Sequence, residues 1–208
     1  MGTASRPCIR RLGLLLLSAG ALAACVTTRT PPAPVAPLAP MAPQPWDARL
    51  AQLQHATQWR LDGRAAVAIG TQGWQASLSW NQDEDVSDAH LAGPLGVGAQ
   101  VLRLSPAGLL VNGAPADAAA LEALQARVGF ELPLRELRYW LLGVPEPGAP
   151  ATLELNGMDR AAHLEQAGWN VDFERYMVVV GDRLPQRLVL THAAVRVRIV
   201  IDHWELGQ

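Results

Sequence analysis

The chain has 208 residues, and its 17 basic residues, all arginine, stand against 19 acidic ones for a formal net charge of −2. This balance argues against a nucleic-acid-binding protein, which normally carries a clear basic excess. The only two cysteines, Cys8 and Cys25, are too few for a disulfide framework.

The N-terminus has the form of a bacterial lipoprotein signal. Three arginines precede an apolar run over residues 12–22, which is about half of the roughly 20 residues that a spanning helix needs. The run ends in Leu-Ala-Ala-Cys, a lipobox. We therefore expect residues 1–24 to be a signal peptide and Cys25 to be the acylated first residue of the mature chain. The alternatives are an uncleaved helix or a signal cut after Ala-x-Ala.

A proline-rich linker is expected to follow the lipid anchor. Residues 26–45 hold seven prolines among Ala, Thr and Val, and Arg29 is the one charge. Such a segment buries no core and favours an extended polyproline conformation of about 3.1 Å per residue. We expect residues 25–45 to be the acylated cysteine and its linker, and residues 46–208 to be one folded domain of normal size.

Helix and strand patterns begin at the domain boundary. Residues 47–57 predict a short amphipathic helix with Asp47 as its N-cap. Residues 59–69 and 74–80 alternate apolar and polar side chains, which predicts a hairpin of two half-buried strands. A third strand contains Ala89 and Leu91.

The segment from Gly93 to Gly98 breaks this regular pattern. It combines three glycines and Pro94 with apolar side chains, whereas an ordinary solvent loop has a polar tip. Leu95 either packs back into the core or forms an exposed apolar tip that contacts lipid or a partner. The residues alone leave both interpretations open.

The rest of the domain predicts a hairpin, two helices and more strands. Residues 99–104 and 109–112 form the hairpin, and Pro115 and Pro133 each precede an apolar stripe at helical spacing. Residues 153–204 return to alternating strands. This order favours a mainly β (α+β) fold, with an antiparallel sheet or barrel and helices packed on one side.

The sequence shows no pattern for catalysis or metal binding. It has no Gly-x-Ser-x-Gly, His-Glu-x-x-His or phosphate-loop motif, and its five histidines are scattered. We expect no enzyme activity, metal or cofactor, and a function based on binding and transfer.

Several motifs in order resemble the LolB family, the outer-membrane lipoprotein receptors of Gram-negative bacteria. They are the strand at residues 59–67, Trp80 with Gln82, Gly93-Pro94-Leu95-Gly96, the helix signature at residues 132–134 and 139–145, Gln166-Ala167-Gly168-Trp169, Leu184-Pro185 and Trp204. Gly93 stands where a polar residue can precede the Pro-Leu-Gly of the family.

The resemblance implies an incomplete antiparallel β-barrel with helices covering an apolar cavity. It also implies a monomer, anchored in the outer membrane and facing the periplasm, that receives acylated lipoproteins from a LolA-like carrier and inserts them into outer-membrane lipid. Pro94, Leu95 and Gly96 would form a membrane-insertion loop. From apolar faces alone, the cavity-wall candidates are Trp80, Leu91, Val101, Trp140 and Leu141. The alternatives are a phospholipid or other hydrophobic-ligand carrier and a structural envelope lipoprotein.

Overall fold

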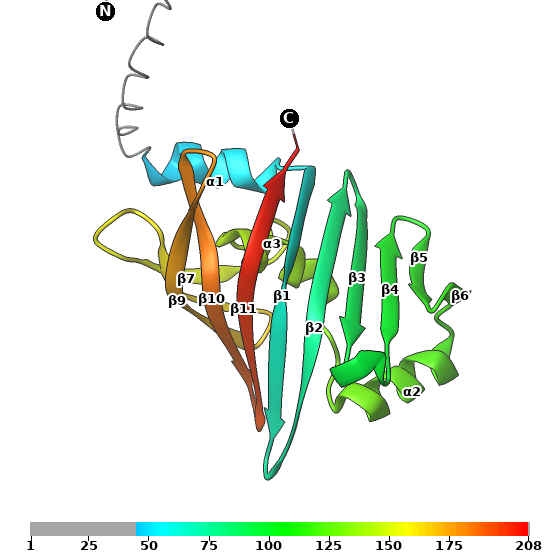
Figure 1. The fold of residues 1–208 in the computed structure, drawn as a ribbon. Coiled ribbons are helices and arrows are strands. Elements are labelled where there is room, and N and C mark those ends of the chain that lie inside the picture. The colour runs from blue at the N-terminus through cyan, green and yellow to red at the C-terminus, as the bar shows by residue number, and fades with distance from the viewer. Residues whose placement is uncertain (1–44, 208) are drawn as a thin grey trace, which may run out of the picture. The chain divides into compact units, whose positions relative to one another are not determined.

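One antiparallel sheet of eleven strands organises the domain (Figure 1). The structure is a computed structural model, and it describes residues 45–207. The strand order is β6-β5-β4-β3-β2-β1-β11-β10-β9-β8-β7. The strands are β1 (Gln58–Ile69), β2 (Gln72–Asp83), β3 (Val86–Ala92), β4 (Gln100–Ser105), β5 (Gly108–Val111), β6 (Ala114–Pro115), β7 (Ala151–Leu155), β8 (Ala161–Gln166), β9 (Trp169–Val179), β10 (Asp182–His192) and β11 (Val195–Leu206).

The first and last strands pair at the centre of this sheet. β1 forms the expected hairpin with β2, in which Leu61 lies opposite Trp80, and its other edge pairs with β11. The strands before the helices therefore spread to one side of this pair, and those after the helices spread to the other. Because β6 and β7 end the sheet, it is open, as expected of an incomplete barrel.

A close approach between the two central strands requires glycine at position 63. The register between β1 and β11 shifts between Asp62 and Gly63. A Cβ atom on Gly63 would lie 2.3 Å from the Val200 carbonyl oxygen, far inside van der Waals contact. The glycine therefore permits the two strands to pair closely at this irregularity.

Three tryptophans pack together across β2, β1 and β11. The ring centroid of Trp59 lies 6.1 Å from that of Trp80 and 5.5 Å from that of Trp204. The Trp204 indole N–H donates a hydrogen bond to the Pro185 carbonyl oxygen at 3.0 Å. All three tryptophans are buried, so the N- and C-terminal ends of the domain share one core.

In the described part of the chain, three α-helices accompany the sheet: α1 (Trp46–Gln54), α2 (Ala118–Val128) and α3 (Leu134–Leu142). α3 lies behind the sheet in Figure 1, and its apolar stripe is buried as the helical spacing predicts. α2 lies below β3 to β5, and α1 crosses the opposite end of the strands. Left-handed Gly129 and Gly143 end α2 and α3. No helix within residues 45–207 is long and apolar enough to cross a membrane.

Two predicted helix starts are wrong. α2 begins at Ala118 instead of Pro115, because Pro115 pairs with Leu110 as part of β6. Asp117 caps the helix instead, accepting a hydrogen bond from the Ala120 N–H at 2.8 Å. Asp47 lies inside the first turn of α1, which Pro45 precedes without a side-chain cap.

Candidate functional site

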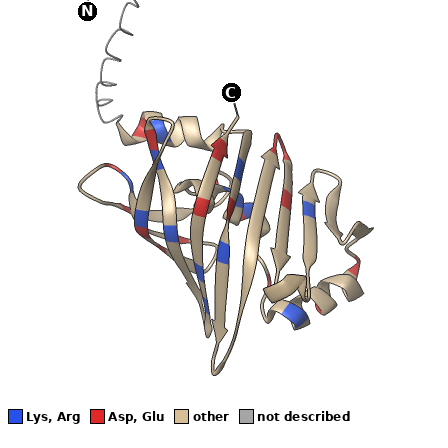
Figure 2. Ribbon diagram, viewed as in Figure 1, with Lys and Arg blue, Asp and Glu red and all other residues tan. Residues whose placement is uncertain are grey.

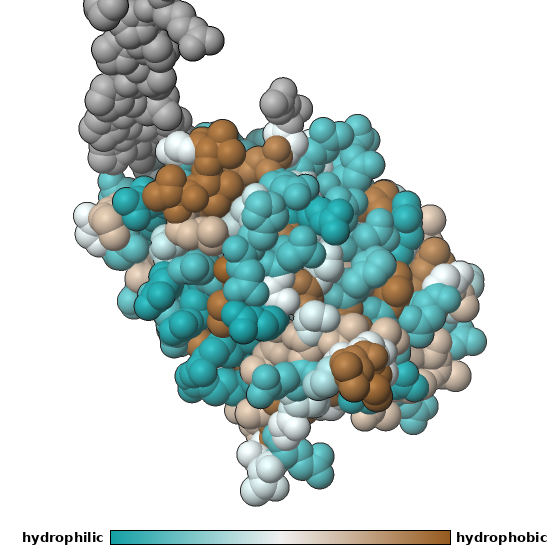
Figure 3. Space-filling view, in the orientation of Figure 1, coloured by the Kyte–Doolittle hydropathy of each residue, from teal (hydrophilic) through white to brown (hydrophobic). Residues whose placement is uncertain are grey.

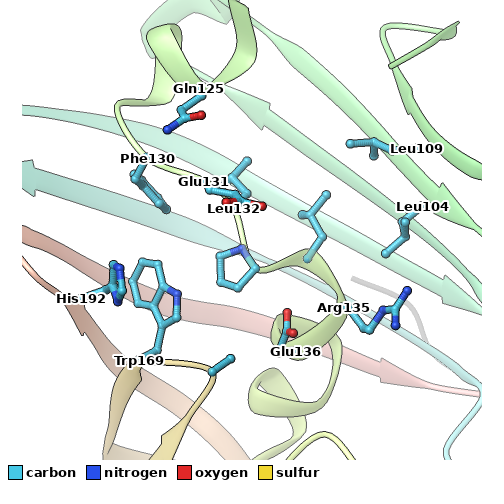
Figure 4. A pocket seen from close by; sticks show the side chains of 13 residues that line it. Leu104, Leu109, Gln125, Phe130, Glu131, Leu132, Arg135, Glu136, Trp169 and His192 are labelled. Carbon is cyan, nitrogen blue, oxygen red and sulfur yellow. The ribbon is translucent and has the colours of Figure 1, made fainter. Parts of the chain in front are cut away.

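A cavity of about 680 Å³ is the candidate functional site. It lies between the two halves of the sheet, beside the connection from α2 to α3. Figure 4 shows the leucines of β4 and β5 on one side and Trp169 with His192 on the other. The cavity is lined by Leu104, Leu109, Gln125, Phe130, Glu131, Leu132, Pro133, Leu134, Arg135, Glu136, Ala167, Trp169 and His192.

The lining divides into an apolar floor and a polar mouth. Phe130, Leu134 and Trp169 are buried. The Phe130 ring meets that of Trp169 edge to face, with centroids 5.7 Å apart. The exposed lining residues include Gln125, Glu131, Arg135 and His192. This arrangement suits an amphiphile whose apolar part enters and whose polar part stays in water.

His192 extends the aromatic floor towards solvent. Its ring stacks on Trp169 with a centroid distance of 5.1 Å, and its Nδ1 donates to the Gly168 carbonyl oxygen at 2.7 Å. Within residues 45–207, no group of three or more His, Cys, Asp and Glu side chains could hold a metal ion.

A buried glutamine fixes the helix that bounds the cavity. Gln166, at the end of β8, accepts hydrogen bonds through Oε1 from the Trp140 indole N–H and the Glu146 backbone N–H, both at 2.9 Å. Its Nε2 donates to the carbonyl oxygens of Glu146 at 2.7 Å and Ala149 at 3.0 Å. One side chain thus joins α3, the segment after it and the sheet.

The Pro94–Gly96 segment forms a single 3₁₀ turn after β3, with Leu95 at its tip. Leu95 has a left-handed φ of 58° and is fully exposed, at 103% of its reference surface. The turn is closed by a hydrogen bond from the Gly93 N–H to the Val97 carbonyl oxygen at 3.0 Å. A Cβ on Gly93 would lie 2.7 Å from that same oxygen, so glycine permits the closure. Of the two interpretations of Leu95, the structure shows the exposed tip.

A smaller cavity of about 240 Å³ lies beneath this turn. Pro94 and Val97 line it from the turn, and Leu91 lines it from β3. The Trp74 indole N–H donates to the Val128 carbonyl oxygen at 3.2 Å and links the sheet to α2 beside this cavity. The base of the turn is therefore supported while its tip projects away.

The predicted cavity-wall residues lie in three different environments. Trp80, Trp140 and Leu141 are fully buried, and neither cavity includes them in its lining. Leu91 lines the smaller cavity. The expected inward direction of Val101 is wrong: it is 36% exposed, whereas its neighbour Leu102 is 1% exposed.

Sequence reasoning missed most of the cavity lining. Leu132 and Pro133 belong to the helix signature, and Trp169 belongs to a strand with clear alternation, but neither pattern shows which apolar positions border a void. Leu104 and Leu109 reach the cavity because β4 and β5 face the α2–α3 connection. That connection brings Phe130 opposite Trp169.

The chain thus combines an open antiparallel sheet, an apolar-floored cavity and a projecting leucine. A LolA superfamily protein from Nitrosomonas europaea has a similar fold, with a TM-score of 0.51 and 10% identity over 79% of this chain and 94% of that one. The chain belongs to the LolB family, because the family model "Outer membrane lipoprotein LolB" matches residues 57–204.

Relatives in other bacteria agree with this assignment. A protein of Nitrosococcus oceani named outer-membrane lipoprotein LolB is 34% identical over 203 residues, covering 95% of this chain and 98% of that protein. One of the same name from Pseudomonas putida is 35% identical over 169 residues, covering 79% of this chain and 82% of that protein.

Proposed function

We propose that this protein is an outer-membrane lipoprotein that receives acylated lipoproteins from a periplasmic LolA-like carrier and inserts them into the outer membrane. The observation that carries the proposal is the cavity of about 680 Å³ with buried aromatic side chains at its floor and charged side chains at its mouth. The membership in the LolB family supports the cargo and the location.

The proposal assigns a separate task to each part of the chain. Residues 1–24 are the signal peptide, Cys25 carries the lipid anchor, and residues 25–45 let residues 46–208 act at a distance from the membrane. Residues 1–44, and with them Cys25, lie outside the described residues. The anchor sets location, and the folded domain carries out the transfer.

The cavity accounts for transfer without an energy source. Each buried methylene group is worth about 0.8 kcal/mol, so acyl chains leave water only for another apolar environment. A cavity with an exposed polar mouth shields the chains less completely than a bilayer does. Release from this cavity into the membrane is therefore downhill, and the earlier handover requires that the cavity bury the chains better than the carrier does. No covalent bond is made or broken in either step.

Leu95 is assigned the membrane-contacting step. Its side chain is fully exposed, on a turn that Gly93 closes and Pro94 stiffens. Burying a leucine side chain in lipid is worth about 1.5–3 kcal/mol. This energy holds the cavity near the bilayer during release.

A charge at the tip tests the proposal. The Leu95→Glu variant keeps its fold and accepts labelled lipoprotein from the loaded carrier, but its delivery into liposomes falls by about tenfold or more, since 1.4 kcal/mol is tenfold. The matched control is Leu121→Glu, which places the same charge at a partly exposed leucine of α2. Equal delivery by the two variants would show that the Leu95 tip has no such role.

A Cys25→Ala form separates anchoring from transfer. It is expected to accept cargo from the carrier and to deliver it with poorer choice between membranes, because the folded domain carries the cavity. If this form accepted no cargo, the lipid anchor would be required for the transfer itself and not only for location. Competition between an acylated peptide and phospholipid for the cavity separates a lipoprotein receptor from a phospholipid carrier.

A further inference from the structure

The turn between β9 and β10 has an unusual residue at its tip. It consists of Val180 and Gly181, because Val179 of β9 pairs with Asp182 of β10. Both turn residues have positive φ, 43° and 84°, as in a type I′ turn. Asn, Asp or Gly normally occupies the first position, and a β-branched residue is strained there.

Val180 shares two properties with Leu95. Within residues 45–207, seven non-glycine residues have positive φ, and these two are the large aliphatic ones among them. In the same part of the chain they are also the two most exposed of the large hydrophobic residues, at 88% for Val180 and 103% for Leu95. Each has a further exposed valine two positions away, Val178 at 62% and Val97 at 72%. Figure 3 shows an apolar area over the β9–β10 turn and α1, and another near the Pro94–Gly96 turn.

Arginines stand beside the Val180 turn. The exposed side chains of Val178 and Arg183 belong to paired positions of the hairpin. Arg49 of α1 forms an ion pair with Asp182 and donates to the Arg183 carbonyl oxygen at 2.6 Å. Figure 2 shows charged residues of both signs where this turn meets α1. The acidic side chain of the turn is thus engaged by Arg49, while Arg183 faces solvent.

The location of the turn indicates which surface it meets. Arg49 fastens it to α1, whose first residue, Trp46, follows the proline-rich segment that leads back to Cys25. The turn therefore lies where the chain arrives from the proposed anchor. A projecting apolar tip beside an exposed guanidinium fits acyl chains beneath a layer of anionic phosphates.

We infer that the β9–β10 turn, with Val178, Val180 and Arg183, is a second membrane-contact site that binds a phospholipid surface at the anchor-proximal end of the domain. This inference rests on the membrane location given under the proposed function. Figure 1 shows this turn and the β3–β4 connection that carries Leu95 at opposite ends of the strands. A flat bilayer therefore contacts only one of the two turns at a time. The linker of residues 25–45 lets the domain reorient so that either turn can face the membrane.

A fluorescent probe beside the tip tests the contact directly. The mature acylated chain, which begins at Cys25, carries Val178→Cys labelled with an environment-sensitive dye, in vesicles that contain a nitroxide-labelled phospholipid. The matched control is Glu174→Cys, an exposed position in the middle of β9, away from both ends of the strands. The parental acylated chain is the labelling blank, because Cys8 has been removed with the signal peptide and the Cys25 thiol carries lipid. We expect several-fold stronger quenching at position 178 than at position 174.

Substitutions then separate membrane contact from structure. Val180→Asn creates the Asn-Gly pair that this turn type prefers, so resistance to urea stays equal or rises while quenching at position 178 falls to the control level. Arg183→Gln is expected to remove the extra quenching that phosphatidylglycerol adds to vesicles of neutral phospholipid. If Val180 had a purely structural role, Val180→Asn would lower both the resistance of the protein to urea and the quenching of the dye at position 178.

Three results would overturn the inference. They are equal quenching at positions 178 and 174, quenching that Val180→Asn leaves unchanged, and a dye that responds to the loaded carrier but not to vesicles, which would make the turn a protein-docking site. Cargo delivery measured in the same samples keeps the proposals distinct. Quenching without delivery would support this contact site and contradict the proposed receptor function. Delivery without quenching would support the receptor function and contradict the contact site.

Discussion

Replacing Gln166 with methionine is predicted to weaken the attachment of α3 to the sheet. Gln166 is 3% exposed, and its amide meets the Trp140 indole N–H and the Glu146 backbone N–H at 2.9 Å each. Methionine has a similar size and fills irregular spaces in a core, so the main loss is of hydrogen bonds and not of packing. The methionine thioether is only a weak acceptor and does not replace the amide oxygen for either of these N–H groups.

The size of the effect follows from the two donors. Trp140 is fully buried, so its N–H finds no water when the acceptor disappears. A buried donor left without a partner costs about 1–3 kcal/mol. The Glu146 backbone N–H also loses its acceptor, but water can replace part of that hydrogen bond. The free energy of unfolding is therefore expected to fall by about 2–4 kcal/mol. This is a large share of the roughly 5–15 kcal/mol that stabilises a typical domain.

Urea unfolding of the parental protein and of the Gln166→Met variant measures this difference in the free energy of unfolding. The control is Gln125→Met, since Gln125 is exposed on α2 and lines the same cavity. A change within about 0.5 kcal/mol is expected there, as for most surface substitutions. An equally small change for Gln166→Met would refute the reasoning, because it would mean that the buried donors find other partners.

Two further predictions concern the sheet. Gly63→Ala is expected to lower the free energy of unfolding by about 1–3 kcal/mol, since the new methyl group meets the Val200 carbonyl oxygen; an unchanged urea midpoint would contradict this. A hydrogen bond from His163 Nδ1 to Asp172, at 2.8 Å, raises the pKa of His163 against the lowering effect of burial. The resulting stabilisation is complete below the ordinary histidine pKa of about 6.5 and is lost as pH rises through the raised value. His163→Gln should therefore destabilise the protein more at about pH 5.5 than at about pH 9 in parallel urea titrations, and an equal loss at both would exclude the charged pair.

Local patterns in the sequence predicted most elements of the fold. Strict alternation marked β2, and the apolar stripe after Pro133 marked α3, because periodicity follows directly from which face of an element is buried. The β1–β11 pair was beyond such reasoning, since it joins strands from opposite ends of the domain. The start of α2 was missed because Pro115 suits both a helix start and an edge strand.

The sequence by itself determined that a signal-like segment and a proline-rich segment precede a strand–helix–strand domain, and that an apolar turn contains Leu95. The tertiary structure decided which apolar side chains border a cavity. Along β4, buried Gln100 shares the inward face with Leu102, held by its hydrogen bond to the Ala99 carbonyl oxygen, so Val101 points outward. A cavity is space left between elements that are distant in sequence, and no local pattern records how closely those elements approach one another.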